Sequence, residues 1–96
     1  MNTGLKDNVI SEIIDFAVKY GIHKVVLFGS RARGDYSRSS DIDLAILGGD
    51  VTRFTLAMEE DVDTLLTFDV IDLANCTSKD LLDSIQKEGV VLYEEI

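Results

Sequence analysis

Two aspartates are the residues whose types and spacing most directly suggest chemistry. Asp41 and Asp43 stand two residues apart in an otherwise apolar run. Strand alternation places them on one face, with Cα atoms about 7 Å apart. Neighbouring carboxylates repel one another, and a divalent cation between them removes that cost, because carboxylates and phosphate oxygens are usual Mg²⁺ ligands. Taken alone, the pair is more often a strand cap and a solvated side chain, so the surrounding sequence must decide.

The loop before these aspartates offers a place for a phosphate. Gly29 and Ser30 directly follow a short apolar run. A glycine there lets the backbone approach a phosphate closely, and the amides of the turn and the Ser30 hydroxyl can donate to its oxygens. Arg31 can add positive charge to the same group. Glycine–serine turns are common by themselves, but an anion site facing paired carboxylates suits a metal–triphosphate.

Alternating helices and strands must position these residues. Helices are predicted over residues 7–20, 52–66 and 79–88, and strands over 24–28, 41–47, 68–73 and 90–93, with a short helical turn in the loop between the first two strands. The second long helix is expected from the spacing of Phe54, Ala57, Met58, Asp61 and Leu65. The alternation predicts an α/β (α+β) fold, a small mixed β-sheet of about four strands with helices packed on it. The periodicity leaves strand order and direction open.

Length and charge narrow the possible partners. The 96 residues predict one domain over residues 1–96, and 18 acidic against 9 basic residues give a net charge of -9. Direct binding of nucleic acid is not expected, because it depends on neutralising phosphates with Lys and Arg. Three arginines, Arg31, Arg33 and Arg38, nevertheless gather within one loop and suggest a local anion site. The lone Cys76 and the lack of a long apolar run predict a cytoplasmic protein without membrane contact.

The glycine–serine turn and the aspartate pair together resemble a known signature. Gly29-Ser30, ten intervening residues and then Asp41-x-Asp43 resemble the polymerase-β-type nucleotidyltransferase superfamily. The stretch LFGSRARGDYSRSSDIDLAI is similar to the minimal nucleotidyltransferases (MNT proteins), small prokaryotic proteins commonly paired with a HEPN-domain protein. The segments FDVIDL and KEGVVLYEE also look like that family, so the resemblance covers most of the chain. It implies the nucleotidyltransferase fold, here as a single minimal domain.

The resemblance also implies a third carboxylate on a neighbouring strand, for which Asp69 and Asp72 are the candidates. The two side chains point to opposite faces of the predicted strand. If Asp72 were catalytic, Asp69 would lie in the core, where an unpaired carboxylate is costly. If Asp69 is catalytic, Phe68 and Val70 face the core instead. We therefore favour Asp69 and keep Asp72 as the alternative.

The roles of these residues follow from the resemblance and from two-metal chemistry. Asp41 and Asp43 would hold the Mg²⁺ that chelates the triphosphate, and with Asp69 they would hold a second Mg²⁺. Asp69 would also accept the proton of the attacking hydroxyl as a general base. Gly29 and Ser30 would bind the β- and γ-phosphates of ATP, and Arg31 would offset the charge that develops there.

The resemblance implies an enzyme that moves AMP from Mg-ATP to a protein hydroxyl. The expected acceptor is a tyrosine of a cognate HEPN toxin, which would make this chain the antitoxin of the pair. Two alternatives stay open: a catalytically inactive antitoxin that neutralises its partner by binding alone, and a nucleotide-binding regulatory subunit. The presence of all the candidate carboxylates beside the glycine–serine turn favours the enzyme.

Overall fold

A mixed sheet of four strands forms the centre of the protein, seen here in a computed structural model that describes residues 3–95. The strand order is β3-β2-β1-β4; β1 pairs antiparallel with β2 and β4, and β2 pairs parallel with β3. Along the chain the elements are α1 (Asp7–Lys19), β1 (Lys24–Phe28), α2 (Ser30–Arg33), β2 (Ile42–Leu47), α3 (Val51–Glu60), β3 (Phe68–Asp72), the 3₁₀ helix η1 (Leu73–Asn75), α4 (Lys79–Glu88) and β4 (Val90–Glu94). Within this described part, no helix is long and apolar enough to cross a membrane. The predicted fold class is confirmed.

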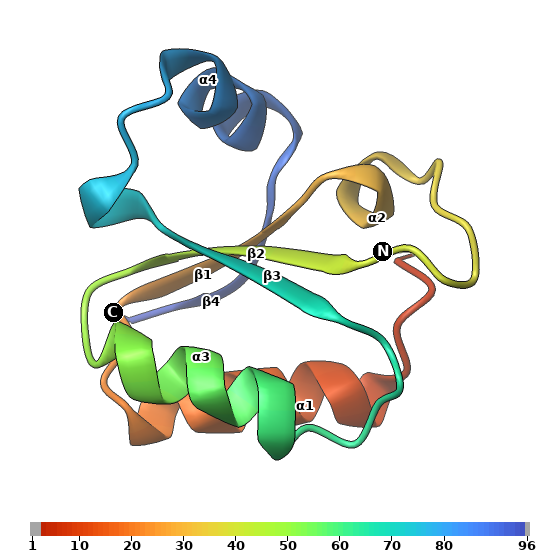
Figure 1. Ribbon diagram of the computed structural model, residues 1–96, viewed down its shortest axis with the longest axis vertical. Coiled ribbons are helices and arrows are strands. Elements are labelled where there is room, and N and C mark those ends of the chain that lie inside the picture. The colour runs from red at the N-terminus through yellow and green to blue at the C-terminus, as the bar shows by residue number, and fades with distance from the viewer. Residues whose placement is uncertain (1–2, 96) are drawn as a thin grey trace.

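Helices cover the two faces of the sheet unequally. Helices α1 and α3 lie against one face, and α4 stands over the other (Figure 1). The larger core lies between the sheet and α1 and α3, and it includes Leu27, Leu44 and Phe68 from three neighbouring strands. A smaller apolar cluster beneath α4 is formed by Val26, Phe28, Ala45 and Ile85. Apolar residues cover both faces of β2, so a carboxylate within this strand is unusual. Asp43 is such a carboxylate.

Most predicted elements are confirmed to within about two residues of their ends. Gly21 follows the first helix with a φ of 68°, which only glycine adopts readily. The Ser78 hydroxyl accepts a hydrogen bond from the Leu81 amide and caps α4. The strand predicted over 41–47 begins one residue later, so that Asp41 directly precedes β2.

One helix is shorter than predicted. The helix expected over residues 52–66 ends at Glu60, and Leu65, one of the residues whose spacing predicts that helix, is fully exposed. Three consecutive acidic residues occupy the end of the helix, where the negative pole of the helix dipole disfavours them. The buried Val62 then anchors the chain in the core as it turns toward β3.

Candidate active site

Two parallel strands bring candidate carboxylates together at one end of the sheet. Asp43 in β2 is the direct partner of Asp69 in β3, and residues paired in this way project from the same face. Asp41 lies exposed just before β2, where the amide of Ile42 donates to the Thr67 carbonyl at 2.9 Å and holds the starts of the two strands together. The three candidate residues therefore come from two adjacent strands, with Asp43 and Asp69 within them and Asp41 directly before β2.

The predicted facing of the third strand is confirmed. Phe68 is buried and Val70 packs against the larger core, so Asp69 points to the opposite face and is exposed. Asp72 serves as a cap instead: its carboxylate accepts hydrogen bonds from the Ala74 amide at 3.1 Å and from Asn75 Nδ2 at 2.8 Å. Asp72 thus stabilises the turn into η1 and lies on the other side of the strand from the paired carboxylates.

Electrostatics mark Asp43 as the centre of the group. Partial burial raises the pKa of Asp43, and the negative charges of Asp69 and then Asp41 raise that pKa further. The positive charge of Arg33 acts in the opposite direction but does not cancel the shift. A cation bound beside Asp43 would reduce the repulsion between its carboxylate and the two neighbouring ones.

The donor chemistry fits a divalent cation, although the carboxylates do not form a complete cage. Within residues 3–95, no three His, Cys, Asp or Glu side chains converge closely enough to hold a metal ion by themselves. Asp43 and Asp69 stand side by side, and the repulsion felt by Asp43 shows that their charges interact. Mg²⁺ is usually bound by one or two carboxylates together with substrate phosphates, so an incomplete protein cage suits that ion.

Gly29 connects β1 to α2 directly beside these carboxylates. Its φ of 75° and ψ of -155° are accessible almost only to glycine. A Cβ at this position would also overlap the Asp43 carboxylate, with Oδ2 as the nearest atom. Gly29 is therefore required twice, once for the sharp turn and once for the close approach of the turn to Asp43.

The short helix after this glycine carries groups that can bind an anion. The first amide groups of a helix have no acceptors within that helix, and the Ser30 hydroxyl makes no hydrogen bond within the described part of the chain. Arg33 lies close enough to lower the pKa of Asp43 and makes exposed ion pairs with Asp35 and Glu88, each at 3.2 Å. Exposed pairs of this kind contribute little, so the Arg33 guanidinium can exchange them for another anion.

Arg31 is placed differently from what the sequence predicted. Its side chain is only 2% exposed, and Nη1 donates to the Thr3 carbonyl at 2.9 Å. Nε and Nη2 donate to the Ser40 carbonyl at 3.2 and 3.1 Å, and Nη2 also reaches the Arg38 carbonyl. The expectation that Arg31 contacts phosphate is therefore corrected: its donors are committed to backbone carbonyls. Through Ser40, the residue before Asp41, Arg31 fixes the loop that delivers that carboxylate.

We expect Arg31→Ala to lower the free energy of unfolding by about 2–4 kcal/mol, because buried carbonyls lose their donors and a cavity remains. Arg31→Lys should recover only part of this loss, since an ammonium cannot replace the planar fork of donors. Urea unfolding followed by circular dichroism measures both values. A loss below about 0.5 kcal/mol for Arg31→Ala, the range of ordinary surface substitutions, would show that this network is not structural.

Sequence and structural comparisons identify the class of protein. The model of the "Polymerase beta, Nucleotidyltransferase" family matches residues 11–95. A protein of Methanocaldococcus jannaschii named "Putative protein adenylyltransferase" is 38% identical over 81 residues, which cover 75% of this chain and 79% of that protein. This chain belongs to the polymerase beta nucleotidyltransferase family.

Solved structures resemble the fold over nearly its whole length. A toxin–antitoxin structure with AMP-PNP superposes with a TM-score of 0.67 at 27% identity, covering 90% of this chain and 73% of that chain. The structure of the toxin–antitoxin MntA-HepT gives a TM-score of 0.62 at 20% identity, covering 94% and 74% of the two chains. The expected nucleotidyltransferase fold is confirmed.

Proposed function

We propose that this chain transfers AMP from Mg-ATP to a hydroxyl group of a partner protein, and that it acts in this way as an antitoxin. The observation that carries the proposal is the direct pairing of Asp43 with Asp69 beside the Gly29 turn. The name of the Methanocaldococcus relative and the toxin–antitoxin structure with AMP-PNP support the same activity.

The nucleotide would lie with its triphosphate against the first turn of α2. Gly29 allows close approach, and the Ser30 hydroxyl with the first amides of the helix would donate to the β- and γ-phosphates, which leave as pyrophosphate. Arg33 takes the charge-offsetting role that the sequence assigned to Arg31, because its guanidinium is exposed and close to Asp43. This arrangement fixes the α-phosphate near the carboxylates.

The carboxylates would supply metal ligands and a base. Asp41 and Asp43 would hold one Mg²⁺ and, together with Asp69, a second. Bound there, the ions would neutralise phosphate charge and lower the pKa of the attacking hydroxyl. Asp69 is exposed at the edge strand β3, where an incoming hydroxyl can reach it, and would accept the proton. Its place in the register beside Asp43 keeps that base next to the nucleotide.

The acceptor is expected to be a separate protein. We assign it to a cognate HEPN-domain toxin, modified on a tyrosine, as the resemblance of residues 27–46 implies. The toxin–antitoxin structures with the same fold support a protein partner of this kind. Modification of the toxin would then silence it.

One observation favours a second candidate, an antitoxin that acts by binding alone. The fold is shared with a toxin–antitoxin structure, and that fold can present a partner-binding surface whether or not its carboxylates turn over ATP. The decisive experiment incubates the chain with Mg-ATP and a candidate HEPN-domain partner protein, and then measures the intact mass of that partner. Additions of one or more AMP units support transfer, whereas neutralisation of the toxin without added mass supports binding alone.

We expect Ser30→Ala to lower the rate of AMP transfer about 10²-fold, the usual effect of removing one donor to a developing charge. The melting temperature should stay unchanged, because the Ser30 hydroxyl has no partner within the described part of the chain. Ser39→Ala is a matched control, since Ser39 is an exposed serine of the following loop. Equal transfer rates for wild type and Ser30→Ala would show that the hydroxyl does not touch the phosphates.

A further inference from the structure

A cleft opens beside the two segments that lead into β2 and β3, the strands that carry Asp43 and Asp69. It has a volume of about 820 Å³ and is lined by the N-terminal segment, the loop after α2 and the turn before β3. Its apolar wall includes Val62, Leu65 and Leu66, of which Leu65 is completely exposed. Leu65 and Leu66 together give the cleft a contiguous apolar wall, and contiguous apolar surface rimmed by polar residues is typical of a binding groove.

The charges around this cleft differ from those of the whole molecule. Its lining contains three cations, Lys6, Arg31 and Arg38, and one anion, Asp63, in a chain whose net charge is -9. Arg31 is committed to backbone carbonyls. Lys6 and Arg38 are exposed and form no ion pair within the described residues. The cleft is therefore a locally positive, partly apolar surface on an acidic protein.

The cleft also lies within reach of the carboxylates along the chain. Arg38 stands three residues before Asp41, and Leu66 stands three residues before Asp69. Three residues of extended chain span at most about 10 Å. A peptide seated in the cleft could thus place a hydroxyl a few residues further along beside Asp69.

We propose that this cleft, formed by Lys6, Arg38, Val62, Leu65 and Leu66, docks the segment of the acceptor protein that carries the modified hydroxyl, and that this segment combines carboxylates with apolar side chains. Charge complementarity carries the assignment, because the remaining acidic surface repels such a segment and the two free cations attract it. The apolar wall of the cleft then favours a segment that carries apolar side chains next to its own carboxylates. This inference names the acceptor of the proposed function and rests on it, but binding in the cleft does not require turnover.

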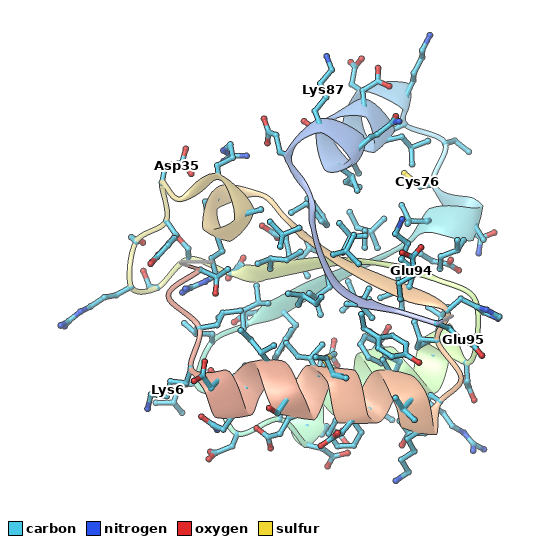
Figure 2. The ribbon with its side chains drawn as sticks, turned by 180° about the vertical axis from the view of Figure 1, so that it is seen from behind. Lys6, Asp35, Cys76, Lys87, Glu94 and Glu95 are labelled. Atoms are coloured by element: carbon cyan, nitrogen blue, oxygen red, sulfur yellow. The ribbon has the colours of Figure 1, made fainter. Side chains whose placement is uncertain are left out.

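The test is a titration of the ¹⁵N-labelled chain with the peptide Ac-Glu-Asp-Leu-Tyr-Glu-Leu-NH₂, followed by amide chemical shifts. We expect shifts at Lys6, Arg38 and the 62–66 turn, and at least fivefold weaker binding when the acidic residues are replaced by their amides. The double variant Lys6→Glu/Arg38→Glu should also bind at least fivefold more weakly. Lys87→Glu is the matched control, because Lys87 projects from α4 on the far side of the molecule from Lys6 (Figure 2).

Several outcomes would overturn the inference. The proposal is overturned if the peptide does not shift the amide signals of the cleft residues. It is also overturned if a peptide with Lys in place of Glu and Asp binds as tightly as the acidic peptide. Mg-ATP alone moving the same signals would assign the cleft to the nucleotide, and shifts that follow protein concentration would assign it to a second copy of the chain. The titration measures binding and does not depend on turnover. If the chain binds the peptide but transfers no AMP, the proposed function is contradicted and the docking surface is still supported.

Discussion

Asp43→Asn is expected to reduce AMP transfer about 10³-fold or more while leaving the folded chain at least as stable as wild type. Asp43 stands between the other two carboxylates, so its loss removes the ligand shared by both expected cation positions. Its charge is also unfavourable in the free protein, because burial, Asp69 and Asp41 all raise its pKa. The neutral amide removes that repulsion, so activity and stability should move in opposite directions.

The pH dependence of stability gives an independent check on the same residue. Because the pKa of Asp43 is raised on folding, the folded chain binds this proton more tightly than the unfolded chain does. Its contribution to the free energy of unfolding therefore decreases as pH rises from the unfolded to the folded pKa. Asp43→Asn should remove this decrease, whereas Asp83→Asn, a change at an exposed position on α4, should keep it. Identical pH profiles for wild type and Asp43→Asn in the absence of metal would contradict the electrostatic description of the site.

Asp69→Asn and Asp72→Asn are expected to separate catalysis from stability. Asp69→Asn should lower transfer by about 10²–10⁴-fold, the range for loss of a general base, with little change in nucleotide affinity. Asp72→Asn should retain transfer and change stability little, because an amide oxygen can still accept the Ala74 N–H and cap η1, whereas Asp72→Ala should retain transfer and lose about 1 kcal/mol of stability. Transfer assays and urea unfolding of these variants provide the comparison. If Asp72→Asn is inactive and Asp69→Asn is active, then the catalytic carboxylate of β3 is Asp72 and our choice of Asp69 is wrong.

Local patterns predicted most of the fold and the main group of carboxylates. Alternation of side chains was enough to place Ile42 and Leu44 in the core and Asp43 opposite them, and to prefer Asp69 to Asp72. The register that pairs Asp43 with Asp69 was not accessible in this way, because it depends on strand order and on the parallel direction of β2 and β3.

Long-range contacts explain what the sequence could not predict. Arg31 resembles a phosphate ligand in a loop rich in arginine, yet one of its acceptors, the Thr3 carbonyl, lies 28 residues away along the chain. Spacing alone cannot reveal such a partner. The early end of α3 has a similar cause, since Val62 is buried in the core to which α1, α3 and the sheet all contribute. The arginine cluster itself was a real signal, but the structure favours Arg33 as the member that faces the site.

The central claim is that the paired carboxylates transfer the α-phosphoryl group of ATP, with its nucleoside, to a protein. The most direct measurement incubates the chain and the proposed HEPN-domain partner with Mg²⁺ and ATP labelled with ³²P at either the α- or the γ-phosphate. We expect label on the partner from α-labelled ATP alone, release of pyrophosphate, and no labelling with Asp43→Asn or with EDTA. Label from γ-labelled ATP, or a neutralised partner that carries no label from either nucleotide, would contradict this claim.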